Sequence, residues 1–81
     1  MVYPYKNLLI PIEIKSGASG TLRSLHEFMD RCTHHFAIRF YGGNINVDTL
    51  KTNKGKEYKL LNLPYFLAAR LDNYLEWFIA Q

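Results

Sequence analysis

Apolar and polar residues alternate near the start of the chain, over residues 8–15. Three isoleucines fall on one side of this pattern, whereas Glu13 and Lys15 fall on the other. Since successive side chains of a β-strand point to opposite faces of a sheet, the alternation predicts a strand on which Glu13 and Lys15 project together. Pro11 has no N–H to donate, so we expect its side of the strand to be unpaired or distorted there.

A helical period replaces the alternation after a loop of serines and glycines at residues 16–20. The next apolar residues are spaced three or four apart, with charged residues between them, which predicts an amphipathic helix running to about Arg31. Ser19 or Thr21 is expected to cap its first turn. The buried side of this helix should comprise Leu22, Leu25, Phe28 and Met29.

Three further strands and a second helix are predicted in the rest of the chain. The run F-A-I-R-F-Y at residues 36–41 alternates as a strand does, and G-G-N ends it. Residues 45–51 and 57–63 flank T-N-K-G, whose Gly55 suits a turn with positive φ, so they should form a hairpin. Pro64 should open a helix, where its missing N–H is not needed. The buried side of that helix should comprise Leu67, Leu71, Tyr74, Leu75 and Phe78, widened by Trp77.

The expected element order is therefore β-α-β-β-β-α, which predicts an α/β fold with a short mixed sheet. If the strands on either side of the first helix are parallel neighbours, that helix crosses one face of the sheet. One such unit leaves the edges and part of the second face uncovered, so we expect the sheet to be completed by more chain or by an assembly. We expect residues 1–81 to form a single domain, because 81 residues are fewer than most domains contain.

Composition and charge narrow the setting. Cys32 is the sole cysteine, which excludes an internal disulfide and favours a reducing, cytoplasmic environment. No apolar run approaches the roughly 18 residues of a membrane span, so no membrane partner is expected. The net charge of +3 permits nucleic-acid binding without requiring it. Candidate contacts to a nucleic-acid backbone are Arg23, Arg39, Lys54 and Lys56; the alternative is a solvated surface, with Arg39 in a structural ion pair.

The pair Glu13 and Lys15 suggests chemistry as well as structure. A strand carboxylate binds a hard cation such as Mg²⁺, together with a neighbouring backbone carbonyl. A lysine beside it orients or deprotonates a water molecule, or stabilises charge that develops on a phosphate. The spacing E-x-K is also common on surface strands, where both residues are merely solvated.

The string P-I-E-I-K-S-G, followed by L-R-S-L-H-E-F-M and F-A-I-R-F-Y, resembles the second half of a PD-(D/E)xK restriction-endonuclease-like core. With L-L-N-L-P-Y-F-L-A-A-R-L downstream, residues 8–71 are similar to the nuclease-like C-terminal domain of a group of prokaryotic AAA+-type ATPases, a domain of unknown function. The resemblance implies that Glu13 is the metal-binding carboxylate and Lys15 the catalytic lysine. It further implies the carbonyl of Ile14 as a metal contact, Mg²⁺ as cofactor, and an ATPase domain as partner in a parent chain.

One feature of that superfamily is missing. Its members share the metal with a second acidic residue on the strand before E-x-K, whereas no Asp or Glu precedes Glu13 here. Asp48 is the sole later acid in a strand context, and its spacing does not place it beside Glu13. One carboxylate is a poor Mg²⁺ site. We therefore expect this chain to be the C-terminal fragment of a nuclease-like domain that forms a homodimer and is inactive by itself. Mg²⁺-dependent phosphodiester cleavage is expected only if the missing part of the site is supplied. The alternative is a non-catalytic module that binds nucleic acid or protein or serves in assembly.

Overall fold

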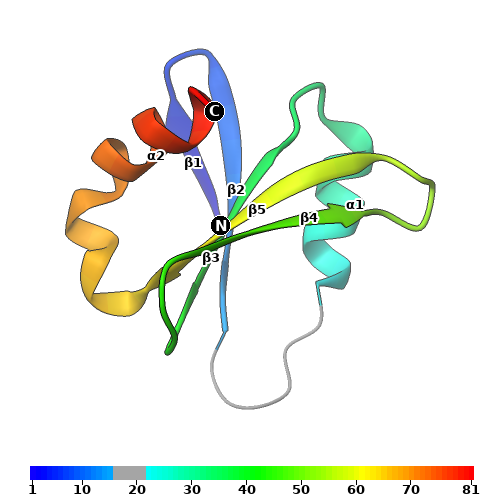
Figure 1. Cartoon of the computed structure of the whole chain (residues 1–81). Helices are drawn as coiled ribbons and strands as arrows, with labels where there is room; N and C mark the ends of the chain where they lie inside the picture. The colour runs from blue at the N-terminus through cyan, green and yellow to red at the C-terminus, as the bar shows by residue number, and fades with distance from the viewer. Residues whose placement is uncertain (16–21) are drawn as a thin grey trace.

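The computed structural model describes residues 1–15 and 22–81 of the chain. Within these residues, five strands form one mixed sheet in the order β1-β2-β3-β5-β4 (Figure 1). The α/β class and the mixed sheet predicted from the sequence are confirmed. The elements in chain order are β1 (Val2–Tyr5), β2 (Leu8–Ile14), α1 (Arg23–Arg31), β3 (Phe36–Tyr41), β4 (Asn46–Lys51), β5 (Glu57–Pro64), the 3₁₀ helix η1 (Tyr65–Arg70) and α2 (Leu71–Ile79).

The central strands β2, β3 and β5 run parallel, and the outer strands β1 and β4 run antiparallel to their neighbours. Helix α1 connects β2 to β3, so the predicted crossover between parallel neighbours is confirmed. The pairing of β2 with β3 begins at Ile12, directly after Pro11. Proline therefore occupies a position at which β3 requires no N–H from it, as its chemistry demands.

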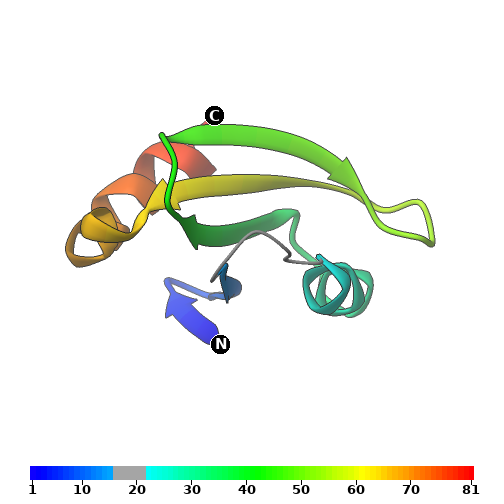
Figure 2. The same ribbon diagram turned by 90° about the horizontal axis from the view of Figure 1, so that it is seen from below.

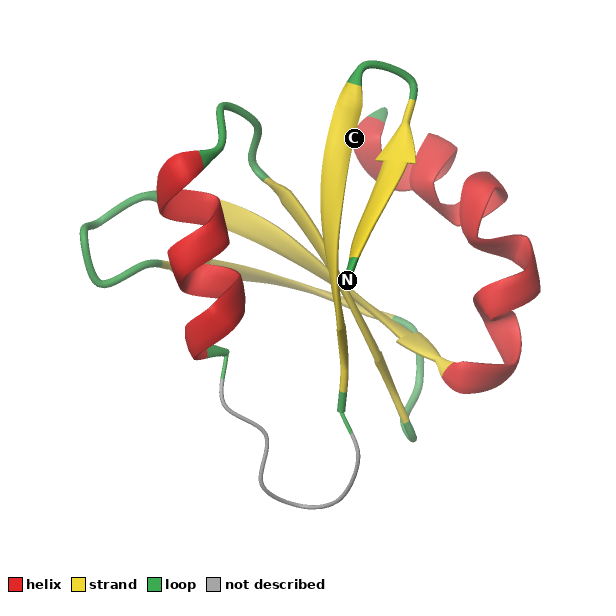
Figure 3. Ribbon diagram, turned by 180° about the vertical axis from the view of Figure 1, so that it is seen from behind, coloured by secondary structure: helices red, strands yellow, loops and turns green. Residues whose placement is uncertain are grey.

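Both faces of the sheet are covered by an apolar layer, because successive side chains of the central strands alternate between the two helices. In β3, Ile38 and Phe40 pack with α2, whereas Ala37 packs with α1. The two helices accordingly lie on opposite sides of the strands (Figures 2 and 3). The cluster beneath α2 is the larger one and comprises Ile10, Ile12, Ile38, Phe40, Leu61, Leu63, Leu71, Leu75 and Phe78.

Helix α1 buries the side predicted from its periodicity. Leu25 and Met29 are fully buried, and Leu22 packs against them partly exposed. Leu22 occupies the N-cap position without a side-chain hydrogen bond. The predicted caps Ser19 and Thr21 lie outside the described residues.

The predicted hairpin between β4 and β5 is also confirmed. Gly55 sits in its turn with a φ of +89°, a conformation that glycine adopts without a steric penalty. This turn lies beside the C-terminal end of α1 (Figure 1), to which it is joined by a hydrogen bond from the Thr52 hydroxyl to the Asp30 carboxylate, 2.5 Å long.

Four features differ from the sequence-based expectations. Strand β1 was not predicted; it forms a hairpin with β2 through Lys6, whose φ is 54°. Pro64 ends β5 in extended backbone (φ −58°, ψ 148°), and a helical segment begins directly after it as predicted, but the first six residues of that segment form the 3₁₀ helix η1 before α2 starts. Trp77 is 46% exposed and Ile14 53% exposed. Trp77 therefore does not widen the buried side of α2, and Ile14 lies at the open end of its strand, beyond the core.

Among the described residues, no helix is long and apolar enough to cross a membrane.

Candidate functional site

Glu13 and Lys15 lie at the carboxyl end of β2 and share one face of the sheet. Ile12 packs beneath α2, so alternation directs Glu13 to the opposite face, which α1 partly covers. Lys15 continues that alternation, because its N–H donates to the Phe40 carbonyl of β3 (2.9 Å) and extends the ladder. Both side chains are partly exposed. Ligands of open sheets bind outside the carboxyl ends of parallel strands, which is where these two residues lie.

Arg39 is the direct neighbour of Glu13 on the adjacent strand. The parallel register of β2 and β3 pairs the two residues, so both project from the same face. Within the described part of the chain, the sole ion pair joins Arg23 to Glu27. The structural ion pair suggested for Arg39 is therefore not formed with Glu13, although the two side chains are neighbours.

A chain of hydrogen bonds orients Arg39 instead. The Arg39 Nε donates to Oδ1 of Asn62 (2.8 Å), and Nδ2 of Asn62 donates to the Asp48 carboxylate (2.9 Å). Asn46 donates to the other oxygen of Asp48 (3.0 Å). Asn62 is only 1% exposed, and it satisfies both ends of its amide within this row, as a buried polar group must. The row therefore fixes the plane of the guanidinium from two neighbouring strands.

The remaining donors of Arg39 are directed elsewhere. Its guanidinium carbon lies 5.8 Å from the centre of the Tyr41 ring, within the range of a cation–π contact. Its terminal nitrogens make no hydrogen bond to any described residue. Burial raises the pKa of Tyr58, and the positive charge of Arg39 opposes that rise. The Arg39 side chain is thus fixed in orientation beside Glu13, and its terminal N–H groups make no hydrogen bond to the described residues.

A complete Mg²⁺ site does not form from the residues described. No group of three His, Cys, Asp or Glu side chains comes close enough together there to hold a metal ion. In the β1–β2 hairpin Val2 pairs with Pro11, and the Met1 carbonyl accepts from the Ile12 N–H, so β1 brings no side chain opposite Glu13. The Glu13 carboxylate and the Ile14 carbonyl offer two protein oxygens, so water molecules, phosphate oxygens or a further carboxylate would have to supply the rest of the octahedral shell of Mg²⁺.

Asp48 shares the face of Glu13 but does not join it. Strands β3 and β5 separate the two residues, and Asp48 already accepts from Asn62 and Asn46. The sequence singled out Asp48 as an isolated acid, but gave no sign of the amide row. That row depends on the register of the three strands β3, β5 and β4, which no local pattern specifies.

The other predicted nucleic-acid contacts lie elsewhere. The Arg23 side chain is 83% exposed on α1 and pairs with Glu27. Lys54 is exposed in the β4–β5 turn. The Lys56 ammonium donates to the carbonyls of Met29 (2.7 Å) and Cys32 (2.6 Å) at the end of α1. Lys56 therefore caps a helix, and we leave it out of the candidate site.

Aromatic residues adjoin the carboxyl ends of the strands. The Tyr65 hydroxyl donates to the Lys15 carbonyl, which ties the first turn of η1 to the end of the E-x-K strand. Tyr65 is 46% exposed and Phe66 82% exposed. The helical period after Pro64 predicted a buried side that begins at Leu67, and it gave no sign that the two aromatic residues before Leu67 are exposed.

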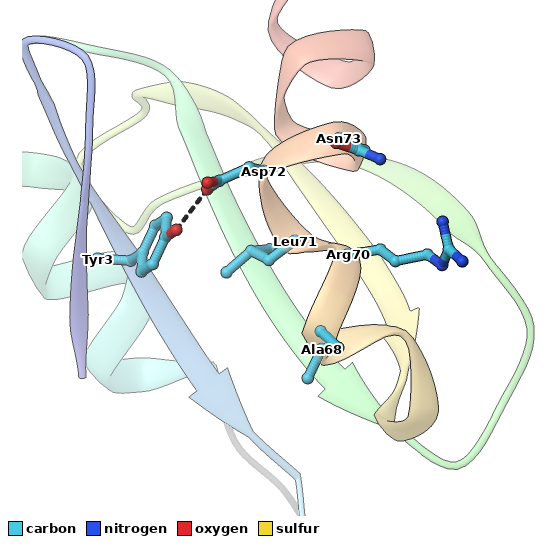
Figure 4. Close-up of a pocket in the computed structure, with 7 residues that line it drawn as sticks. Tyr3, Ala68, Arg70, Leu71, Asp72 and Asn73 are labelled. Carbon is cyan, nitrogen blue, oxygen red and sulfur yellow. Dashed lines mark hydrogen bonds between the residues drawn. The ribbon is translucent and has the colours of Figure 1, made fainter.

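A separate hollow lies between β1 and the start of α2 (Figure 4). The Tyr3 hydroxyl donates to the Asp72 carboxylate, and this hydrogen bond raises the pKa of Tyr3 because it stabilises the protonated phenol. Leu71 lies beside this pair and belongs to the apolar cluster beneath α2, against which Tyr3 also packs. This contact joins β1 to α2 on the face opposite Glu13, and we assign it a structural role.

Comparison with known proteins finds no matching family model, no similar curated protein and no similar solved structure. The resemblance to the nuclease superfamily therefore stays a prediction.

Proposed function

We propose that this chain is a nuclease-like domain that binds the phosphodiester backbone of nucleic acid at the carboxyl ends of β2 and β3. The observation that supports this is the pairing of Glu13 with Arg39, with Lys15 on the same face. Two cations that flank one carboxylate suit a phosphate group, since Arg and Lys donors bind phosphate oxygens by charge-assisted hydrogen bonds. Arg39 supplies oriented donors, and Lys15 supplies a second positive charge.

We further propose that the isolated chain does not cleave what it binds. Glu13 is one carboxylate where the superfamily uses two, and Asp48 is committed to amides with β3 and β5 in between. Mg²⁺-dependent cleavage would require another carboxylate from a second chain or from a longer parent chain. In that completed site Glu13 and the Ile14 carbonyl would contact the metal, and Lys15 would stabilise charge on the phosphate.

The second candidate is a binding or assembly module without any catalytic role. What favours it is the hydrogen-bonded row behind Arg39: Asn62 of β5 bonds the guanidinium, and Asp48 and Asn46 of β4 in turn hold Asn62 in place. In this alternative, Glu13 only reduces the net positive charge of the surface around Arg39 and Lys15, and it takes no part in catalysis.

The proposed partners follow from the same features. β1 and β4 are edge strands, whose outer N–H and C=O groups are available for pairing, so we propose a homodimer in a cytoplasmic setting, where the free Cys32 stays reduced. An ATPase domain in a parent chain remains part of this proposal through the resemblance alone.

Incubation with supercoiled plasmid and with single-stranded DNA, in Mg²⁺ and in Mn²⁺, tests the proposal. We expect a mobility shift without cleavage, weakened in Lys15→Ala. Cleavage by the wild type that is lost in both Glu13→Ala and Lys15→Ala would contradict the incomplete site and show that a dimer completes it. No shift at any salt concentration would contradict the binding proposal itself.

A further inference from the structure

We propose that a hollow beside the candidate site binds the unpaired bases of single-stranded nucleic acid, with Phe66 and Tyr65 as stacking surfaces. This inference rests on the proposed function, because the bases in the hollow would belong to the same strand whose phosphates Lys15 and Arg39 contact. It goes further by naming the form of nucleic acid.

The hollow lies where β3 and β5 end. Its walls come from the β3–β4 connection on one side and from η1 on the other, and its volume is about 840 Å³. The lining includes Tyr41, Gly42, Ile45, Tyr65 and Phe66. The lining described for it contains no acidic side chain, so it does not repel a phosphate backbone.

Phe66 is the most exposed large apolar residue of the described chain, at 82%. Its neighbour Leu67 packs toward the cluster beneath α2, and this contact anchors η1 and holds Phe66 outward. Pro64 fixes the backbone before the turn, with φ at −58°. A phenylalanine that is 82% exposed contributes little to folding, whereas a flat aromatic face is what an unstacked base requires.

Tyr65 is held in place on the other side of this turn. Its hydroxyl donates to the Lys15 carbonyl, so the ring spans from η1 to the end of β2. The β3–β4 connection is fixed in a similar way, because the Tyr41 hydroxyl donates to the Asn44 carbonyl. The hollow is therefore formed in advance by two hydrogen-bonded turns.

Two contacts connect this hollow to the cations. Tyr41 lines the hollow and also lies beneath Arg39, at 5.8 Å from the guanidinium carbon. Tyr65 lines the hollow and is bonded to the backbone of Lys15. A strand whose bases enter the hollow would thus have phosphates close to Lys15 and Arg39. Neutral aromatics flanked by cations match the pattern of sites that bind single strands, in which stacking accompanies backbone charge.

Paired bases do not fit this arrangement. In a duplex the faces of the bases are stacked on one another, so Phe66 and Tyr65 would reach them only after unpairing. The geometry thus favours single strands, loops and frayed ends over continuous duplex.

The test is fluorescence anisotropy with three labelled probes of equal length: single-stranded DNA, the same sequence as RNA, and an abasic deoxyribose-phosphate strand. We expect the DNA or RNA strand to bind more tightly than the abasic strand. Phe66→Ala should weaken that binding about tenfold, because a stacked base is lost, and leave the abasic strand unaffected. Phe66→Tyr should retain binding.

The matched control is Trp77→Ala, which removes another aromatic residue that is 46% exposed but lies on α2, outside the hollow. Equal binding of the abasic and base-containing strands, with Arg39→Gln weakening both, would overturn the stacking site and leave the proposed function standing. No binding of any probe would overturn both. Conversion of a dimer to a monomer by Phe66→Ala, without loss of binding, would show that a second copy covers this surface and would overturn the inference.

Discussion

The two ends of the sheet use the same kinds of residue in opposite ways. At the amino ends of the parallel strands, polar side chains hold the structure together: Lys56 caps α1, and the His34 and His35 rings bond the carbonyls of Leu9 and Glu57. At the carboxyl ends, Glu13 and Lys15 make no side-chain hydrogen bond to the described residues, and Tyr65 and Phe66 are exposed.

The difference shows that residue type alone does not separate structural from functional side chains. Lys56 and Lys15 are both partly buried lysines next to a strand. What distinguishes them is whether the carbonyls at a helix end lie within reach of the ammonium. Since α1 runs back across the sheet, its C-terminal carbonyls come to the amino ends of the strands, and only Lys56 meets them. The following predictions test this division, from the largest expected effect to the smallest.

Lys56→Met should lower the free energy of unfolding by about 3 kcal/mol, because two charge-assisted hydrogen bonds to helix-end carbonyls are lost. Urea denaturation measures this change. The matched control is Lys54→Met, two residues away and exposed, which should change stability by less than about 0.5 kcal/mol. Similar values for both variants would contradict the structural role of Lys56.

Asn62→Leu should lower the free energy of unfolding by about 2 kcal/mol. Leucine has a similar volume but leaves Arg39 and Asp48 without the amide that joins them. The same variant should also weaken nucleic-acid binding, because the guanidinium loses its fixed orientation. Asn73→Leu, at an exposed position of α2, provides the control in both assays. Loss of stability with unchanged binding would show that the row serves the fold alone.

Arg39→Gln should make the plot of log binding constant against log salt concentration less steep by about one unit, since one phosphate contact is removed. The affinity for single-stranded DNA, measured at several salt concentrations, gives this slope. Arg23→Gln on the exposed side of α1 should leave the slope unchanged. An equal effect of the two variants would indicate attraction by net charge and not by a defined site.

The smallest effect concerns Tyr58, which lies beneath α1 at the amino end of β5. Burial raises its pKa above the ordinary value of 10.0, so the protonated phenol is favoured by folding. The stability it contributes is present below the unfolded pKa and is lost as the pH rises through the folded pKa. The melting temperature of the Tyr58→Phe variant should therefore fall less between about pH 9 and pH 11 than the melting temperature of the wild type. Parallel declines would contradict this.

Much of the fold could be predicted from the sequence, because its signals are local. The alternation at residues 8–15, the helical period that includes Leu25 and Met29, and the turn at Gly55 each specify one element, and all three are confirmed. β1 was missed because four residues with a proline give a weak strand signal. The 3₁₀ helix was missed because its apolar spacing is the same as that of a short α-helix.

The candidate site could be predicted only in part. Glu13 and Lys15 share a face because they are two apart on one strand, which is local information. Arg39 was named as a candidate nucleic-acid contact, but its place beside Glu13 and its anchoring through Asn62 and Asp48 depend on how strands far apart in sequence pair. Tyr65 meets Lys15 fifty residues away, and no sequence pattern reports such a contact.

The most direct test of the central claim compares two charge-matched double variants in binding to single-stranded DNA. Lys15→Gln with Arg39→Gln removes two positive charges at the carboxyl ends of the strands, and Lys51→Gln with Lys54→Gln removes two from the β4–β5 hairpin at the opposite end. The account predicts that the first pair abolishes most of the affinity and that the second retains most of it. Equal losses in the two pairs would contradict a defined site at the end of β2 and β3.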